Sequence, residues 1–135
     1  MNTKYLYTMP EIENKYNVQL DEGEKVVFTA KLITFGNEKN QRLEAGEAYF
    51  TLTNKRILAD NTVGVFTIDL ENEVTKIREV MSGFWIFKSH YFAVDLNNEV
   101  VFDEGRQSLT GYVFYFNVED TVAFNEIVKG IDNYF

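Results

Sequence analysis

The sequence contains no cysteine, and this absence removes several classes of function at once. Disulfide-linked scaffolds, zinc sites built from thiolates and cysteine nucleophiles all depend on that residue. The single histidine, His90, excludes metal sites with several histidine ligands in the same way. We therefore expect a chain that uses neither a metal ion nor a cofactor.

Long apolar runs are also missing, since no stretch approaches the ~20 residues that a membrane-spanning helix needs. Residues 1–10 contain one lysine and no sustained apolar segment, so they do not have the form of a signal peptide. These two absences lead us to expect a cytoplasmic protein without stable membrane insertion.

Positive charge is scarce, because 13 Lys and Arg residues face 21 Asp and Glu residues, for a net charge of −8. Proteins that bind nucleic acid normally show a basic surface, which supplies most of their non-specific affinity for phosphates. The same deficit works against anionic membranes unless a local basic patch exists. Nucleic acid is therefore not an expected partner.

Apolar and aromatic residues are plentiful, at 45% and 16% of the chain, with 12 Phe and 8 Tyr. A chain of 135 residues has the usual size of one domain, and this composition supports an ordered core. Phe and Tyr at such density favour half-buried, pleated surfaces, so we expect a fold that is mainly sheet.

Alternation of apolar and polar residues predicts about seven antiparallel strands. Eight segments are candidates, of which 71–80 is ambiguous: residues 26–33, 48–52, 56–59, 63–70, 71–80, 91–96, 100–102 and 111–116. Residues 35–45 are predicted to form a polar loop, and Asn97-Asn98 a turn. For residues 71–80 a helix is the alternative, because Val74 and Ile77 also suit a helix face.

The ends of the chain have a helical period. Near the C-terminus four apolar residues recur at i, i+3, i+4 and i+7, which is typical of an amphipathic helix: Phe124, Ile127, Val128 and Ile131. Asn117 or Asp120 can cap its start, and Gly130 is predicted near its end. At the N-terminus, Thr8 and Glu11 have capping-box spacing, and the apolar residues Met9, Ile12 and Tyr16 then recur at the spacing of a short amphipathic helix. Residues 1–19 are therefore predicted to be a helical lead-in before a domain at 20–135.

The segment YFTLTNKRILAD, residues 49–60, predicts a tight hairpin with polar residues at its tip. Thr53 can bond locally, Asn54 tolerates a positive φ, and Arg56 can hold the tip by bonding to carbonyls or to an acidic side chain. We interpret Thr53, Asn54 and Arg56 as a structural hairpin. The alternative is that Lys55 or Arg56 contacts a ligand.

This hairpin carries a resemblance to the GRAM and bacterial pleckstrin-homology (PH-like) domains. The matching motifs are a Gly-Glu pair before the first strand, an L-T-N-x-R motif and an A-F…I helix after the last strand: Gly23-Glu24, Leu52–Arg56 and Ala123-Phe124 with Ile127. The resemblance spans roughly residues 20–131 and implies a strongly bent antiparallel sheet or partial barrel of seven strands, capped by a C-terminal helix. It also implies a binding module for proteins or lipids, not an enzyme.

The sequence contains no combination of residues that is typical of a catalytic site. Ser89 and His90 are neighbours, and neighbours on a strand point to opposite faces, so they cannot act as nucleophile and base there. The paired carboxylates at 21–22 and 103–104 fall in solvated turns, where nothing raises a pKa. We expect no enzyme activity.

The segment MSGFWIFKSHYF, residues 81–92, is apolar on both faces, which one buried sheet face does not explain. Phe84, Trp85, Phe87 and Tyr91 are our candidate interface, because such aromatic residues are enriched in the cores of protein interfaces. The alternative is that this segment is a strand of the core. The leading hypothesis is a non-enzymatic module of the bacterial cytoplasm that binds a protein partner or assembles with itself.

The alternative function is peripheral binding of a phosphoinositide-like head group. Its candidate contacts are Lys39, Arg42 and Lys55, although Glu38 and Glu44 offset the charge of the loop that holds the first two. A small apolar ligand held within the bent sheet is a third possibility, since the chain is so rich in aromatic residues.

Overall fold

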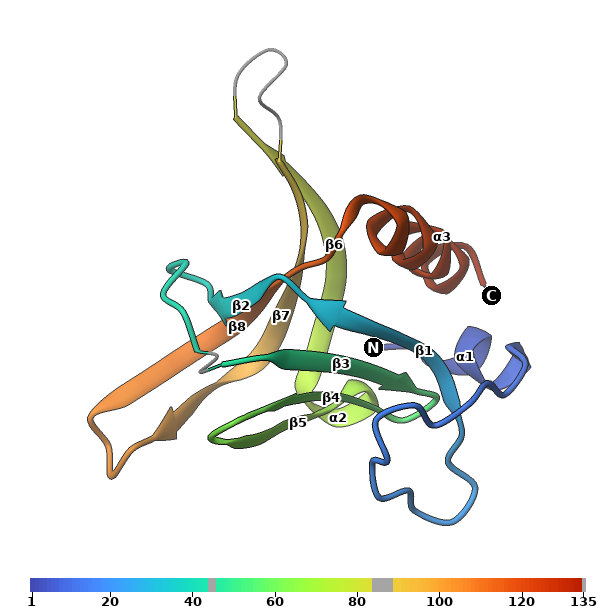
Figure 1. The fold of residues 1–135 in the computed structure, drawn as a ribbon, viewed down its shortest axis with the longest axis horizontal. Helices are drawn as coiled ribbons and strands as arrows, with labels where there is room; N and C mark the ends of the chain where they lie inside the picture. The colour runs from blue at the N-terminus through green and yellow to red at the C-terminus, as the bar shows by residue number, and fades with distance from the viewer. Residues whose placement is uncertain (44–45, 84–88, 135) are drawn as a thin grey trace.

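The computed structural model describes residues 1–43, 46–83 and 89–134 and consists of two four-stranded antiparallel sheets with a long C-terminal helix (Figure 1). The first sheet has the order β1-β3-β4-β5 and the second β2-β8-β7-β6. The elements are α1 Lys4–Thr8, β1 Val26–Leu32, β2 Thr34–Asn37, β3 Ala48–Thr53, β4 Arg56–Asn61, β5 Gly64–Asp69, α2 Leu70–Glu73, β6 Val74–Ser82, β7 Ser89–Phe102, β8 Gln107–Tyr115 and α3 Val118–Asn133. The prediction of a mainly β chain that ends in a helix is confirmed.

One bent run of chain belongs to both sheets. β1 pairs with β3 in the first sheet, and after a single residue, Ile33, the chain continues as β2 and pairs with β8 in the second. The bend is fixed by a hydrogen bond of 2.8 Å from the Ile33 N–H to the Tyr115 carbonyl. The two sheets therefore meet at a corner where the backbone is continuous.

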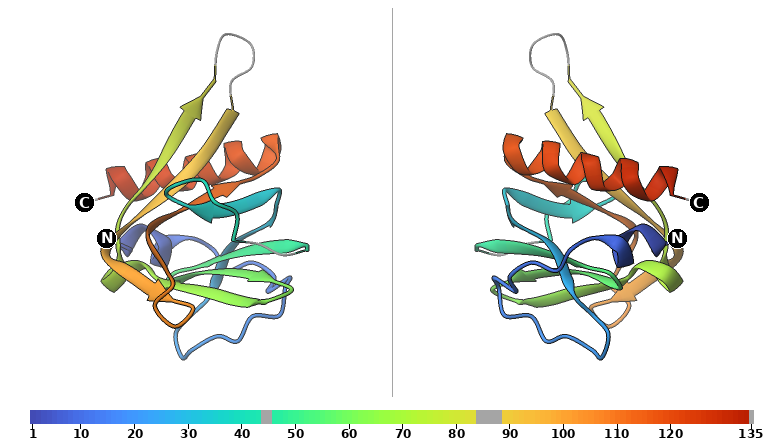
Figure 2. Two further views of the ribbon diagram at one scale, coloured as in Figure 1. Left: turned by 90° about the vertical axis from the view of Figure 1, so that its left-hand side faces the viewer. Right: turned by 90° about the vertical axis from the view of Figure 1, so that its right-hand side faces the viewer.

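Helix α3 covers the open end of the two sheets (Figure 2). It begins at Asn117, whose side chain accepts a 2.8 Å hydrogen bond from the Asp120 N–H, as the capping pattern predicted. The predicted stripe is the buried face of the helix: Phe124, Ile127, Val128 and Ile131. Because that stripe lies in the core, the opposite side of α3 faces outward.

Three elements between β1 and β8 differ from the prediction. β2 occupies part of the expected loop, and β7 runs through the expected Asn97-Asn98 turn, which is absorbed by a register shift between Asp95 and Val100. The start of residues 71–80 is the helical turn α2, because the Asp69 side chain accepts hydrogen bonds from the Glu71 and Asn72 N–H groups. The rest of that segment is β6, as predicted.

The N-terminal helix lies earlier than predicted. It ends at Thr8, whose hydroxyl donates back to the Tyr5 carbonyl at 2.6 Å and so does not cap a following helix. Residues 9–25 are not helical and run beside the first sheet, with the Ile12 N–H bonded to the Val26 carbonyl and the Tyr16 ring against Tyr49. The predicted helix over Met9–Tyr16 is therefore wrong, because its residues belong to a non-helical segment that runs beside the first sheet.

Gly130 lies near the C-terminal end of α3, which runs to Asn133, as predicted. A β-carbon at this position would come within 2.2 Å of the Tyr5 ring, which lies across α3 where α1 packs against it. Glycine is tolerated inside the helix because it makes room for this ring.

This packing predicts opposite effects of Gly130→Ala in two backgrounds. In the wild type the new methyl group collides with Tyr5, so we expect a lower free energy of unfolding. In Tyr5→Ala the collision is gone, and the higher helix propensity of alanine should stabilise the protein by about 1 kcal/mol. Urea unfolding of the four proteins in this double-mutant cycle measures both effects, and equal effects in the two backgrounds would contradict the contact.

Candidate functional site

The hairpin between β3 and β4 is bonded to a buried carboxylate, Glu24, that lies just before β1. Glu24 accepts two hydrogen bonds from the Arg56 guanidinium, at 2.8 Å from Nε and 2.7 Å from Nη2, and a third from the Thr53 hydroxyl at 2.6 Å. The other Nη2 bond of Arg56 goes to the Gln19 carbonyl at 2.8 Å. The motif residues thus bond to the Gly-Glu pair, which explains why both accompany this hairpin.

Asn54 completes the connection. Its side chain accepts a hydrogen bond from the Lys25 N–H at 2.9 Å and donates one to the Gly23 carbonyl at 3.1 Å. Asn54 does not adopt a positive φ, so that part of the interpretation is wrong. The residue is needed here because a short amide can pair with both backbone groups of the neighbouring chain.

The charge of Glu24 is strongly favoured. Burial would raise the pKa of its carboxyl, but the hydrogen bonds from Arg56, Thr53 and the Asp21 N–H, with the charge of Arg56, outweigh burial and lower the pKa to about 2. Arg56 is engaged by these bonds. Thr53, Asn54 and Arg56 all bond to the segment that precedes β1, and their role as a structural hairpin stays a prediction.

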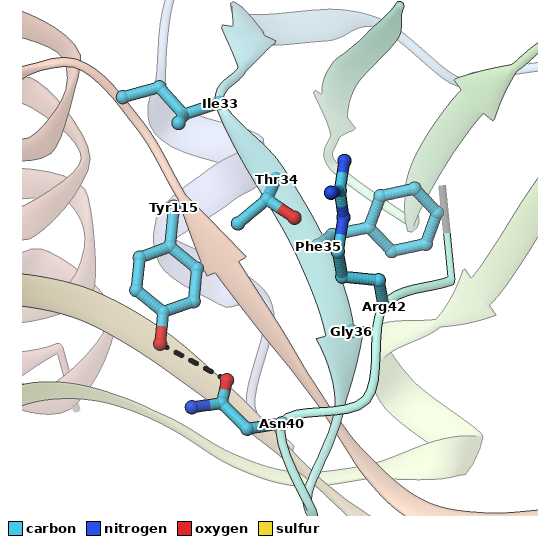
Figure 3. Close-up of a pocket in the computed structure, with 7 residues that line it drawn as sticks. All are labelled: Ile33, Thr34, Phe35, Gly36, Asn40, Arg42 and Tyr115. Carbon is cyan, nitrogen blue, oxygen red and sulfur yellow. Dashed lines mark hydrogen bonds between the residues drawn. The ribbon is translucent and has the colours of Figure 1, made fainter. Parts of the chain in front are cut away.

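The three candidate head-group residues do not converge. Lys55 lies at the tip of the β3–β4 hairpin, where its amine donates to the Glu22 carbonyl at 2.9 Å. Lys39 and Arg42 lie between β2 and β3, at the opposite end of β3 (Figure 1). Arg42 lines a cavity of about 390 Å³ beside the Phe35 ring, and Asn40 there accepts a 3.1 Å hydrogen bond from the Tyr115 hydroxyl (Figure 3).

Lys39 has a basic neighbour that sequence reasoning missed. It lines a polar pocket of about 460 Å³ with Arg106, from the turn between β7 and β8, together with amide and hydroxyl side chains: Asn37, Gln41, Gln107 and Ser108. The Glu38 carboxylate accepts hydrogen bonds from the Thr110 and Gly111 N–H groups of β8, at 3.0 and 3.3 Å. No local pattern joins residues 39 and 106, because only the pairing of β2 with β8 brings their turns together.

Of the four residues of the aromatic candidate interface, the structure describes Tyr91. Phe84, Trp85 and Phe87 lie outside the described residues, and Tyr91 is half-buried, with its ring stacked on Tyr115 of β8 at a centroid distance of 4.7 Å. The described parts of β6 and β7 that lead to them, residues 79–82 and 89–91, project past α3, and we call them the arm (Figures 1 and 2).

A groove of about 640 Å³ separates the arm from α3, and we call it the α3 groove. It is lined by residues of five segments: Ile33, Glu79, Ser89, His90, Tyr115, Phe116, Val118, Thr121, Val122, Asn125, Glu126 and Lys129. Three of these are apolar side chains that remain largely exposed, Val118 at 83%, Ile33 at 65% and Val122 at 61%. Such a gathering of exposed apolar side chains is typical of an interaction surface.

The described residues provide little for catalysis. The His90 ring lies 3.7 Å from the partly exposed Glu79 carboxylate. No group of three or more possible metal-ligating residues occurs in residues 1–43, 46–83 and 89–134. Over the same described ranges, no helix combines the length and apolarity needed to cross a membrane.

Comparisons with known proteins identify the fold. No protein-family model matches the sequence, and no curated protein matches it. Among solved structures, the chain is similar to a Vps36 N-terminal PH domain, with a TM-score of 0.63 and 18% identity over 93% of this chain and 92% of that one. At this identity the likeness shows the fold alone, which is PH-like, as predicted. Membership of the GRAM family stays a prediction.

The Glu24 pKa predicts a stability change in acid. Because the folded-state pKa of about 2 lies below the ordinary 4.5, ionised Glu24 stabilises the fold above pH 4.5, and this contribution is lost as the pH falls towards 2. From that shift, Glu24→Gln should cost about 3 kcal/mol at pH 7 and much less near pH 2.5.

Urea unfolding at a series of pH values measures this difference. Glu99→Gln, at an exposed position of β7, is the matched control and should cost little at any pH. A cost for Glu24→Gln that stays constant from pH 7 to 2.5 would contradict the assigned role of the charged carboxylate.

Proposed function

We propose that this chain is a non-enzymatic protein-binding module whose docking surface is the α3 groove. The observation that carries the proposal is the exposure of Val118, Val122 and Ile33 along one groove. Three apolar side chains exposed together to water do not stabilise the free protein. Their burial by a partner would stabilise the complex.

The PH-like fold supports this reading, because it is generally a non-catalytic interaction module. The core is filled by the chain's own side chains, such as Phe50, Phe92 and Phe114, so the candidate binding surface lies outside it. The partner is a second copy of the chain or another protein. The aromatic segment that contains Phe84, Trp85 and Phe87 belongs to the same proposal, because it follows directly from the arm.

The test removes apolar surface without disturbing the core. Val118→Ser combined with Val122→Ser should abolish retention of partner proteins when the immobilised chain is exposed to an extract of its own source cells. Val101→Ser, at an exposed valine on the far end of β7, is the matched control and should retain them. Quantitative mass spectrometry of the retained proteins measures the difference.

The mass of the protein in solution tests whether the partner is a second copy of the chain. Light scattering after size exclusion at two concentrations should show a discrete oligomer that the double variant loses, if the partner is another copy of the chain. A 15.7 kDa species at both concentrations assigns the groove to a different protein. Equal retention of the same proteins by wild type and the double variant would refute the α3 groove as the docking surface.

A second candidate function is supported by the pocket of Lys39 and Arg106. Two cations with several amide and hydroxyl donors form the kind of site that holds a phosphate group. We expect weak co-sedimentation with phosphatidylcholine vesicles that contain one-fifth phosphatidylinositol phosphate, because two cations near a membrane supply only about 2 kcal/mol.

Lys39→Glu with Arg106→Glu should remove this co-sedimentation. Lys4→Glu with Lys15→Glu changes the net charge equally at exposed positions near the N-terminus, and it should leave the binding in place. If both pairs reduce binding to the same extent, the attraction is a property of the overall charge and the pocket has no specific role.

A further inference from the structure

The outer side of α3 presents a second row of side chains along the groove. Val118, Val122, Asn125 and Lys129 all line the α3 groove and are spaced at i, i+4, i+7 and i+11. Residues with this spacing lie above one another on a helix. The row is apolar at the start of α3 and polar towards its end, so the groove has a direction.

A row of this kind has the form that another helix packs against. Helices pair by placing the i, i+4 rows of one between the rows of the other, which requires an exposed row of matching spacing. The arm forms the opposite wall, because Glu79 and His90 lie on the same strand face as the buried Ile77 and Phe92. Ile33 adds an apolar contact from the bend between β1 and β2.

The charges on α3 are mostly negative. The helix carries one lysine and four acidic residues, Glu119, Asp120, Glu126 and Asp132. Of these charged residues, Glu126 and Lys129 line the α3 groove. That lysine, Lys129, already lies 3.4 Å from the Glu126 carboxylate. Glu79 adds a further acidic group on the arm, and the whole chain has a net charge of −8. A partner with basic residues beside its apolar ones is therefore complementary to this surface.

We infer that the α3 groove binds a basic amphipathic helix of a partner protein. Two apolar side chains of that helix, one turn apart, pack against Val118, Val122 and Ile33. Its flanking Lys or Arg residues face Glu79 and Glu126. This inference rests on the proposed function and specifies the chemistry of the partner.

Three synthetic 18-residue peptides test the inference. The first has leucines at i, i+3, i+4 and i+7 with lysines elsewhere, the second replaces each lysine by glutamate, and the third scrambles the first so that its leucines share no face. Fluorescence anisotropy of labelled peptides against the full chain, at low and moderate salt, measures their affinity. We expect the first peptide to bind at least tenfold more tightly than either of the others.

Matched variants separate the groove from general charge attraction. Val122→Ser and Glu126→Lys should each weaken binding of the first peptide by about tenfold. Val101→Ser and Glu99→Lys make the same changes on the far end of β7 and should weaken it less than twofold. Glu126→Lys and Glu99→Lys alter the net charge equally, so a difference between them reports on the groove.

Two outcomes would overturn the inference. Equal binding of the lysine and scrambled peptides shows that an amphipathic face is not recognised. Equal weakening by Glu126→Lys and Glu99→Lys shows that the peptide responds only to overall charge. Either result leaves the proposed function intact if the valine double variant still loses its partner proteins, so the two hypotheses fail separately.

Discussion

The arrangement of the molecule depends on the contact of Phe124 with aromatic rings of both sheets. Its ring lies 5.4 Å from those of Phe28 and Phe50 in the first sheet and 4.7 Å from that of Phe92 in the second. This cluster holds α3 across the open end of the sheets in one rotational setting. The setting turns Val118 and Val122 outward, so the α3 groove is a consequence of how the core is packed.

Much of the fold could be predicted from the sequence because its signals are local. Alternation along β1, the β3–β4 hairpin and the stripe on α3 each involve residues within a few positions of one another. Errors arose where tertiary contacts override local preference. Met9–Tyr16 has helical spacing, but the chain there follows the first sheet. Asn97-Asn98 favours a turn, but β7 runs through it.

The candidate site was less predictable because it joins distant parts of the chain. Ile33, His90 and Val122 come together only after the sheets have formed and α3 has closed over them. One local signal was available, since Val118 and Val122 are apolar residues off the buried stripe of α3. Apolar residues on the outer side of an amphipathic helix indicate a surface that awaits a partner. Similarly, nothing local connects Lys39 with Arg106.

The position of Ile33 links the groove to the whole fold. This residue marks the bend of the chain shared by both sheets, and its side chain is part of the groove wall. A ligand that binds only the folded chain raises its stability in proportion to the logarithm of ligand concentration over the dissociation constant. Occupancy of the groove acts beside the bend at which β1 of the first sheet continues directly into β2 of the second, and it would slow amide hydrogen exchange in β1 and β2 together.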